Sequence, residues 1–591
     1  MSTGLVRCDL IGKEWVVNGD PYVLTRLKNV LTLAKRQGGQ VVIPATPEQS
    51  RELLWFRQMF PMQVTPEIKL RSLAASWLMS QQRAQDVISG EYNPAPIKFA
   101  RGEAPRDYQW KAANLFKAKK SMLLADDVGV GKTASLIAAI ADPALRPACL
   151  VMPNHLIGQW KAQLRRFTPG LSVHEIKQTS PYSLNVMADC PHCGATVDTV
   201  HETKQLSPTC PVCKKKFSST VPRRPADVTI LAYSKMLQWP NYVGKACKTV
   251  GWEEGHGLRS HDTQRWRAAH SIAKQCEYRI ALTATPLFNL GGEAWNILEC
   301  VSPGFLGEKK EFQETWCGGS SNGKEPALAD PDSFGSYLRS SHVMLRRTAV
   351  EVGIPVHDCQ IIHQTVEADT EIFSKESTRA DEMARIILGE AQSRSKGMDT
   401  IQFDAIMRQA TGLAKVPAIV AFTEMLLEQD EPVVLFAWHQ AVHDLYMERL
   451  SKWHPCKYTG TEKPMEKEAN VEKFVRGDCK VIIISLRAGE GLDGLQHASS
   501  TAVVAELDWT WSVAKQNIGR IARDGQKKPC KAYFMVSEFG SDPIVSQVLG
   551  LKKDQLNGLV GDRVSVPTKA FDSQAEMRRL ARAHLDRVGR S

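Results

Sequence analysis

The segment DDVGVGKT, residues 126–133, has the residue types and spacing of a loop that binds phosphate groups. It follows a short apolar run and precedes the helical pattern ASLIAAIA. Gly129 and Gly131 would let the backbone approach the phosphates, and the start of the following helix would offer free N–H groups. Lys132 would neutralise the β- and γ-phosphates, and Thr133 would ligate Mg²⁺. We therefore expect ATP and Mg²⁺ to bind at this loop.

A second motif, KTVGWEEGH at 248–256, is an apolar run that ends in two carboxylates and a histidine. In an ATP site, one such carboxylate holds the Mg²⁺ shell and the next orients or activates water. By position, we expect Glu253 on the metal side, Glu254 as the catalytic carboxylate and His256 as a coupling residue. Paired glutamates alone are usually a solvated surface, so this expectation depends on the order of the motifs along the chain.

Four of the 14 cysteines form two Cys-x-x-Cys pairs, separated by sixteen residues: Cys190, Cys193, Cys210 and Cys213. This spacing is typical of a tetrahedral site that holds Zn²⁺ with four thiolates. We expect a zinc-knuckle insertion over residues 187–218. Its role has two interpretations: a structural staple for a segment too small to bury a core, or a contact to nucleic acid. The second interpretation depends on the flanking cations Lys214, Lys215, Lys216, Arg223 and Arg224.

The predicted strands and helices that must position these motifs alternate regularly from about residue 104 onward. Short apolar runs alternate with helical patterns, which predicts parallel sheets flanked by helices. The runs form two series: 121–125, 148–152, 228–233 and 279–283, then 433–437, 481–485, 501–507 and 531–536. A mostly polar, helix-like region lies between the two series. The simplest architecture is therefore two α/β lobes that are joined by a helical connector.

Residues 1–103 read as a separate accessory α/β module. Leu24, Leu27, Leu31 and Ala34 fall on one helical face, and Thr46 followed by Pro47 and Gln49 is typical of a helix start. The predicted division of the chain is this module, lobe 1 at 104–300 with the zinc insertion, the connector with insertions at 301–415, lobe 2 at 416–550 and a C-terminal tail at 551–591.

The motifs along the chain also resemble a known family when they are taken in order. They are RDYQ (106–109), DDVGVGKT, LVMPNHLIGQW (150–160), EEGH (253–256), LTATPLFN (282–289), LRR (345–347), SLRAGEGLDGLQ (485–496) and QNIGRIARDGQ (516–526). This succession resembles the Swi/Snf-type ATPases of helicase superfamily two, over roughly residues 104–550. GLAKVPAIV at 412–420, VVLFAWHQAV at 433–442 and AEL before Trp509 look like the HARP-type, or annealing-helicase, branch. The resemblance implies two RecA-like lobes.

The resemblance also implies roles for further residues. Arg106 and Gln109 would contact the adenine. Arg520 and Arg523 would be arginine fingers that lobe 2 supplies across the cleft, because fixed guanidinium groups stabilise the charge on a transferring phosphoryl group. If the fingers lie on the other lobe, hydrolysis requires the lobes to close, and cycles of closure would give a stepping motion. Three more residues would belong to the nucleotide site: Asp127, Gly491 and Asp493.

The chain departs from the usual motifs at several positions. Asp126 stands where the general phosphate-loop motif has its first glycine, and Glu253 stands where the family usually has aspartate. Asp493 replaces a frequent asparagine, and Thr510 with Trp511 replaces the usual Asn-Pro. None of these changes removes a charge that the chemistry needs, so we expect an active ATPase. Glu253 keeps the charge of the usual aspartate but adds a methylene, so we expect it to change the geometry around Mg²⁺ and the rate of turnover.

The composition excludes some classes of protein. Among 591 residues, Lys and Arg exceed Asp and Glu by 75 to 64, a mild excess of +11 that suits a polyanionic partner. The N-terminus lacks the apolar core of a signal peptide, and no run of about 18 apolar residues suggests a membrane span. Ten scattered cysteines favour a reducing compartment, so a cytoplasmic location is expected. The sequence does not specify an oligomeric state.

Three functions agree with these observations. The first is a translocase on double-stranded or branched DNA, which remodels forks or anneals strands. The second is a RapA-type remodeller that acts on RNA polymerase or another DNA-bound partner. The third is a nucleotide-gated scaffold in which Glu253 prevents turnover. The HARP-like features favour the first.

Overall fold

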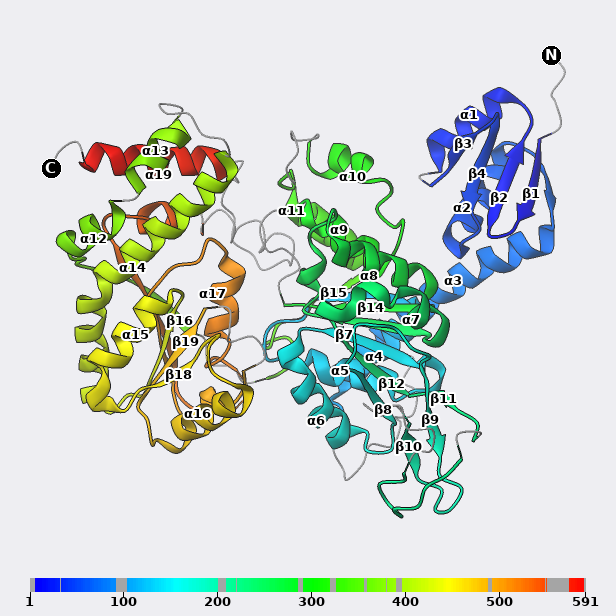
Figure 1. Ribbon diagram of the computed structural model, residues 1–591. Coiled ribbons are helices and arrows are strands. Elements are labelled where there is room, and N and C mark those ends of the chain that lie inside the picture. Colours follow the sequence, from blue (N-terminus) through cyan, green and yellow to red (C-terminus); the bar gives the residue numbers. More distant parts are fainter. Residues whose placement is uncertain are drawn as a thin grey trace.

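The computed structural model describes most of the chain (Figure 1). The described residues are 6–31, 33–91, 104–199, 209–218, 221–284, 291–318, 326–354, 359–378, 380–388, 396–486, 492–523, 525–547, 549 and 573–588. Two lobes with parallel sheets lie side by side, and a small module is attached to lobe 1 (Figure 1). The predicted class, α/β with two RecA-like lobes, is therefore confirmed.

The N-terminal module has its own sheet and core. The sheet order is β3-β4-β2-β1-β5, with strands β1 (Arg7–Ile11), β2 (Glu14–Asn18), β3 (Lys35–Gln37), β4 (Gln40–Pro44) and β5 (Gln63–Thr65). The helices are α1 (Pro21–Val30), α2 (Pro47–Met59) and α3 (Glu67–Ser89). Thr46 caps α2, since its hydroxyl accepts from the backbone N–H of Gln49 at 3.2 Å. Helix α3 connects the module to lobe 1, and Ser80 on it donates to the carbonyl of Ala118.

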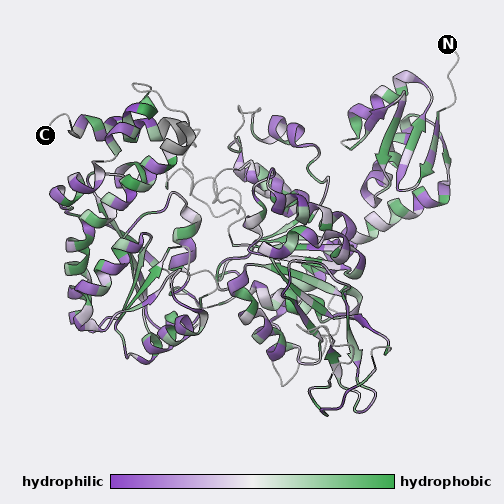
Figure 2. Cartoon of the chain, viewed as in Figure 1, coloured by the Kyte–Doolittle hydropathy of each residue, from purple (hydrophilic) through white to green (hydrophobic). Residues whose placement is uncertain are grey.

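Lobe 1 contains a seven-stranded parallel sheet in the order β15-β6-β14-β13-β7-β12-β8. The strands are β6 (Ser121–Leu124), β7 (Ala148–Met152), β8 (Val173–Ile176), β12 (Val228–Ala232), β13 (Thr249–Glu253), β14 (Tyr278–Leu282) and β15 (Met344–Leu345). Helices α4 (Asp107–Lys119), α5 (Lys132–Ile140), α6 (Ile157–Phe167), α7 (Pro240–Ala246), α8 (Gln264–Gln275) and α9 (Glu293–Val301) flank it. The central strands are green along their length in Figure 2 because both faces of the sheet are covered.

Lobe 2 contains a six-stranded parallel sheet in the order β16-β21-β20-β17-β19-β18. Its strands are β16 (Cys359–Val366), β17 (Val433–Ala437), β18 (Cys456–Tyr458), β19 (Val481–Ser485), β20 (Thr501–Val504) and β21 (Cys530–Ser537). The helices are α12 (Thr370–Ser377), α13 (Ala380–Leu388), α14 (Lys396–Glu428), α15 (Gln440–Arg449), α16 (Pro464–Arg476), α17 (Trp511–Ile518) and, from the predicted tail, α19 (Ser573–Val588).

The segment 301–415 is more than the helical connector that the sequence predicts. It contains helices α10 (Lys309–Trp316) and α11 (Pro331–Ser340), but also β15, which completes the sheet of lobe 1, and β16, which completes that of lobe 2. The expected boundary between 415 and 416 falls inside α14. Short or half-exposed edge strands lack a long apolar run, and for this reason the sequence pattern does not reveal them.

Helix α14 contains the one described stretch, Thr400–Glu428, that is long and apolar enough to cross a membrane. It is a core helix: 61% of its most apolar window is buried, and it packs against α12, α13, α15 and strands of lobe 2. The buried Lys415 on it forms a 2.7 Å ion pair with Asp542. Contacts on several sides and a buried ion pair account for the apolar character of this helix without a membrane.

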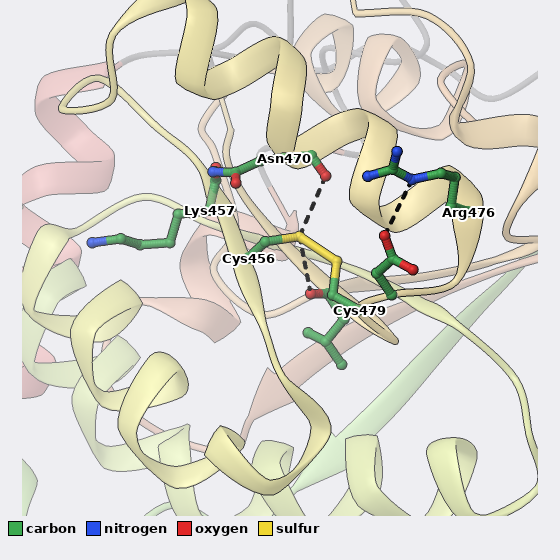
Figure 3. The surroundings of a disulfide bond; sticks show 7 residues. Cys456, Lys457, Asn470, Arg476 and Cys479 are labelled. Carbon is green, nitrogen blue, oxygen red and sulfur yellow. Dashed lines mark hydrogen bonds and ion pairs between the residues drawn. A yellow bond between two sulfur atoms is a disulfide. The ribbon is translucent and has the colours of Figure 1, made fainter.

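Two of the ten scattered cysteines are not free thiols. Cys456 at the start of β18 and Cys479 before β19 form a disulfide, which differs from the expectation of scattered thiols (Figure 3). The bond lies beside the end of α16. Asn470, in the middle of α16, donates from its side chain to the carbonyl of Lys457 at 2.8 Å, and Arg476, the last residue of α16, pairs with Asp478 at 3.1 Å. The disulfide thus ties the edge strand of lobe 2 to its neighbour.

Candidate nucleotide-binding site and metal centre

The phosphate loop connects α5 to β6, which is the second strand from the β15 edge of the lobe 1 sheet. Gly129 and Gly131 have φ of +82° and +86°, a backbone conformation that favours glycine. A side chain at Gly131 would lie 2.6 Å from the amide nitrogen of Gln109. The Lys132 ammonium donates to the carbonyls of Asp126 and Asp127, at 2.9 and 3.1 Å. The loop therefore forms a cradle that opens toward the start of α5, where Thr133 lies.

Asp126 has a clear role at the position of the motif's first glycine. Its carboxylate is fully buried and accepts two bonds from the Arg347 guanidinium, one of them 3.1 Å from Nε. Arg346, just before it, lies 3.6 Å from Asp127. Arg347 also lies over the Tyr108 ring, 5.2 Å from its centroid. The two arginines follow β15, so the strand that the sequence did not predict holds the phosphate loop.

Arg106 and Gln109 lie at a cavity of about 320 Å³ beside the loop. Arg106 precedes α4, and its backbone N–H donates to the Gln109 side chain at 3.0 Å. The Tyr108 hydroxyl donates to the carbonyl of Val130 at 2.8 Å, which connects the start of α4 to the loop. The other lining residues are Ala104, Gly129, Gly131, Ala134, Arg166 and Phe167. A planar, partly apolar group such as a nucleobase suits a cavity of this size and lining.

The paired carboxylates lie at the end of β13, between β14 and β7. Burial above all, together with the charge of Glu254, raises the pKa of Glu253 to about 8. Burial opposes ionisation of Glu254 too, but the hydrogen bond and charge of His256, with Lys132 and Arg520, hold the pKa of Glu254 below its usual value. The His256 ring lies 3.3 Å from Glu254. The pKa values of the two adjacent carboxyl groups are thus shifted in opposite directions.

The donors at this site fit a divalent cation. Glu253 Oε2 is buried and has no hydrogen-bond partner among the described residues. A carboxylate oxygen and a threonine hydroxyl at the start of α5 are hard oxygen ligands, which Mg²⁺ prefers. The residue set Thr133 and Glu253 is therefore compatible with the Mg²⁺ that the sequence predicts.

Lobe 2 presents cations to this site from α17 and the turn after it. Arg520 and Arg523 both donate to the carbonyl of Leu492, at 3.1 and 3.2 Å, and Arg523 pairs with Asp493 at 3.1 Å. A side chain at Gly129 would lie 3.3 Å from the Arg523 Cβ, so lobe 2 contacts the phosphate loop directly. Gly491 lies outside the described residues, as do most of the loops 283–289 and 485–491.

The four clustered cysteines come together as the sequence predicts. Their sulfur atoms all lie within 4.8 Å of one another. Each pair forms the same turn: the N–H groups of Gly194 and Lys214 donate to the carbonyls of Cys190 and Cys210, and φ is +71° and +61° at the two donors. Four thiolates in two such knuckles fit Zn²⁺. The insertion's sheet, in the order β10-β9-β11, consists of β9 (Asn185–Asp189), β10 (Thr196–Asp198) and β11 (Arg224–Pro225).

Comparison with known families agrees with this arrangement. The SNF2-related domain matches residues 70–413, more than half of the chain, and the helicase conserved C-terminal domain matches residues 414–525. The chain belongs to the SNF2-related family. The two matches meet inside α14. The first strand of lobe 2, β16, precedes this boundary and therefore lies within the SNF2-related match.

Curated relatives of this SNF2-related chain are distant. An uncharacterized ATP-dependent helicase of Mycoplasma pneumoniae is 21% identical over 76% of the chain and 41% of its own length. The SWI/SNF-related matrix-associated actin-dependent regulator of chromatin subfamily A-like protein 1 of Drosophila melanogaster is 25% identical over 52% of the chain and 40% of its own length. The chain spans about two fifths of the length of these relatives.

A solved structure with a similar chain is the Sulfolobus solfataricus SWI2/SNF2 ATPase core in complex with dsDNA. It is 19% identical, with a TM-score of 0.34, and the match covers 80% of this chain and 95% of that one. Sequence reasoning missed Lys515 at the SNF2-related site of this chain, and it included Arg346 and Arg347 only as part of the LRR motif, without a role. Their partners lie in the phosphate loop, more than two hundred residues earlier in the sequence.

Proposed function

We propose that this chain is an ATP-driven translocase on double-stranded or branched DNA. The observation that carries the proposal is the approach of Arg520 and Arg523, on lobe 2, to the phosphate loop and Glu254 of lobe 1. Arginines that complete a site on the opposite lobe make hydrolysis depend on lobe closure. Closure and opening would move the two lobes along a nucleic-acid strand in steps.

In this mechanism, Lys132 exchanges its backbone carbonyl partners for the β- and γ-phosphates. Glu254, ionised and oriented by His256, accepts a proton from the attacking water. Arg520 and Arg523, held by the Leu492 carbonyl, stabilise the charge on the transferring phosphoryl group. Mg²⁺, held by Thr133 and Glu253, would neutralise phosphate charge when bound. The adenine would lie in the cavity beside Arg106 and Gln109, while Asp127, Gly491 and Asp493 complete the site.

Duplex DNA is the proposed substrate because the resemblance to Swi/Snf-type ATPases implies movement along duplex DNA, and the two domain matches support that resemblance. The match to subfamily A-like protein 1 of Drosophila supports the HARP-type branch and hence forked or annealing strands. The loops after 153–160, after 283–289 and around 485–491 would contact phosphates. The N-terminal module, which packs on lobe 1 through α3, would select branched substrates, because appended modules add specificity to a motor that reads the backbone.

The test is ATP hydrolysis by one protein preparation with duplex, forked and single-stranded DNA and with RNA. We expect strong stimulation by duplex and forked DNA, and none by any substrate in Glu254→Gln. Displacement of a triplex-forming strand from duplex DNA would measure movement directly. Equal stimulation by RNA, or stimulation only when RNA polymerase is added, would overturn the proposal. Absent hydrolysis would instead favour the nucleotide-gated scaffold.

A further inference from the structure

A large polar cavity of about 960 Å³ lies at the free edge of the lobe 1 sheet, and it shares none of its lining residues with the nucleotide cavity. Helix α6 and the loop after it form one wall, the edge strand β8 forms the floor, and β10 and β11 of the zinc insertion form the opposite wall. Figure 1 shows the insertion projecting from this edge of lobe 1. We call this cavity the insertion groove.

The carboxylates that line the insertion groove are already engaged in holding its walls. Asp198 of β10 accepts from His174 of β8 at 2.6 Å, and the other nitrogen of that ring lies 2.8 Å from the Tyr182 hydroxyl. Asp227 accepts from the Ser172 hydroxyl at 2.6 Å and pairs with Arg146 at 2.9 Å. These groups fix the walls and have little charge left for a ligand.

The cations of the insertion groove are the groups that face solvent. Arg165 on α6, Lys177 after β8 and Arg224 on β11 are all exposed, and they come from three different sides of the groove; Arg224 also lies 3.5 Å from Asp189. Lys161 lies one turn before Arg165 and pairs with Glu175 at 2.8 Å. Four more exposed cations lie beside the cysteine pairs, in the insertion and just after it: Lys214, Lys215, Lys216 and Arg223. Cations spread over several elements match an extended anion better than a small ligand.

We propose that the insertion groove binds the phosphate backbone of duplex DNA beyond the main track across the two lobes. The inference rests on the proposed function and extends it to the zinc insertion. Helix α6 begins at Ile157, inside the segment 153–160 that borders the proposed track, and its basic residues lead from there toward the groove. The mainly polar lining suits backbone contacts, which are charge-assisted and independent of base sequence. The zinc site then serves to hold the basic wall in place.

The test is the triple variant Arg165→Gln, Lys177→Gln, Arg224→Gln, in the full chain with its zinc content measured. We expect weaker binding to duplex DNA and a shallower dependence of log affinity on log salt. The slope should fall by about 0.9 for each phosphate that the variant no longer neutralises. Hydrolysis at saturating DNA should keep its wild-type rate, so that the KM for DNA rises while kcat is unchanged.

A matched control removes three exposed lysines elsewhere: Lys310→Gln, Lys452→Gln and Lys480→Gln. These lysines lie on α10 and the outer surface of lobe 2, each beside a carboxylate. A groove variant whose affinity and salt slope equal those of this control would overturn the inference. So would a loss of affinity for single-stranded RNA with duplex affinity intact. If DNA fails to stimulate even the wild-type protein, the proposed function itself fails, which is a separate result.

Discussion

Lys515 of α17 lies 3.3 Å from Asp127 of the phosphate loop, and this ion pair crosses from lobe 2 to lobe 1. Burial opposes ionisation of Asp127, yet the charges of Lys515 and Arg346 hold the pKa of Asp127 below its usual value. The pair is about three-quarters buried, with side-chain exposures of 23% and 25%. The pair joins α17, which precedes Arg520 and Arg523, to the phosphate loop that these arginines face.

The first prediction concerns this pair. Lys515→Met and Asp127→Asn should each lower the rate of ATP hydrolysis, because each removes an ion pair that favours lobe closure. The loss in the double variant should be smaller than the sum of the two single losses. We expect a coupling of about 0.5–1 kcal/mol, since the pair is partly solvated. A double-mutant cycle on kcat/KM measures it, and the coupling should shrink at high salt. Strictly additive effects would show that the two residues act separately.

The second prediction concerns Arg347. Arg347→Met leaves the buried Asp126 carboxylate without its partner, which should destabilise lobe 1 by about 3–5 kcal/mol. Chemical denaturation measures the loss. Adding Asp126→Asn removes the unpaired charge, so the double variant should recover part of the stability. A double variant no more stable than Arg347→Met would mean that the arginine matters through its packing on Tyr108 instead.

The third prediction separates nucleotide binding from hydrolysis. Lys132→Ala should weaken ATP binding, whereas Arg520→Ala or Arg523→Ala should lower turnover by a factor on the order of 10³ and leave ATP affinity nearly unchanged. Fluorescent-nucleotide binding and steady-state hydrolysis provide the two measurements. Arg523→Lys, which keeps the charge, is the matched control. Loss of affinity with normal turnover in the arginine variants would show that their assignment is wrong.

The fourth prediction concerns the cysteine cluster. The purified protein should contain one zinc ion per chain, and Cys193→Ser should lower zinc content and the thermal stability of the insertion. Cys317→Ser, a change at a cysteine outside the cluster, serves as the control. Metal analysis that finds no zinc, with four rapidly modified thiols, would contradict the prediction.

The fifth prediction is a pH dependence of stability. Burial lowers the pKa of His443 on α15 from the usual 6.5, so the folded protein keeps this ring neutral. The free energy of unfolding is unaffected by this histidine above the unfolded pKa. It falls as pH drops from the unfolded pKa toward the folded pKa, because in that range only the unfolded chain binds the proton. His443→Leu should therefore reduce the loss of thermal stability between about pH 7.5 and about pH 5.5. An unchanged acid sensitivity would contradict this.

The sequence indicates the local geometry of the phosphate loop and of the cysteine knuckles. Gly129, Gly131, Lys132 and the cysteine knuckles act within a few residues of one another, so their spacing specifies their geometry. The residues that hold the phosphate loop from outside lie far from it in the sequence, so local spacing does not reveal them. Arg347 reaches Asp126 across 221 positions, through a strand of two residues that has no periodicity to read. The role of Asp126, which stands where a glycine is usual, therefore becomes clear only from the fold, which places Arg347 beside it.

The disulfide and the edge strand β16 also escape sequence reasoning, for related reasons. Cys456 and Cys479 are 23 positions apart, with α16 between them, and no spacing rule joins them. Strand β16 is half-exposed along most of its length, so it lacks the continuous apolar run of the central strands. In both cases the proximity comes from the order of strands in the sheet, which a local pattern does not contain.

The late position of β15 in the chain has a consequence for synthesis of the protein. A ribosome that has passed β14 has already made six of the seven strands of lobe 1, but the edge beside β6 is still open. An unpaired apolar edge favours wrong pairing with other chains. Closure of this edge and neutralisation of Asp126 both wait for residues 344–347 to emerge. We therefore expect nascent chains truncated before residue 344 to depend on chaperones. Chains that extend past residue 347 should keep lobe 1 folded without chaperones.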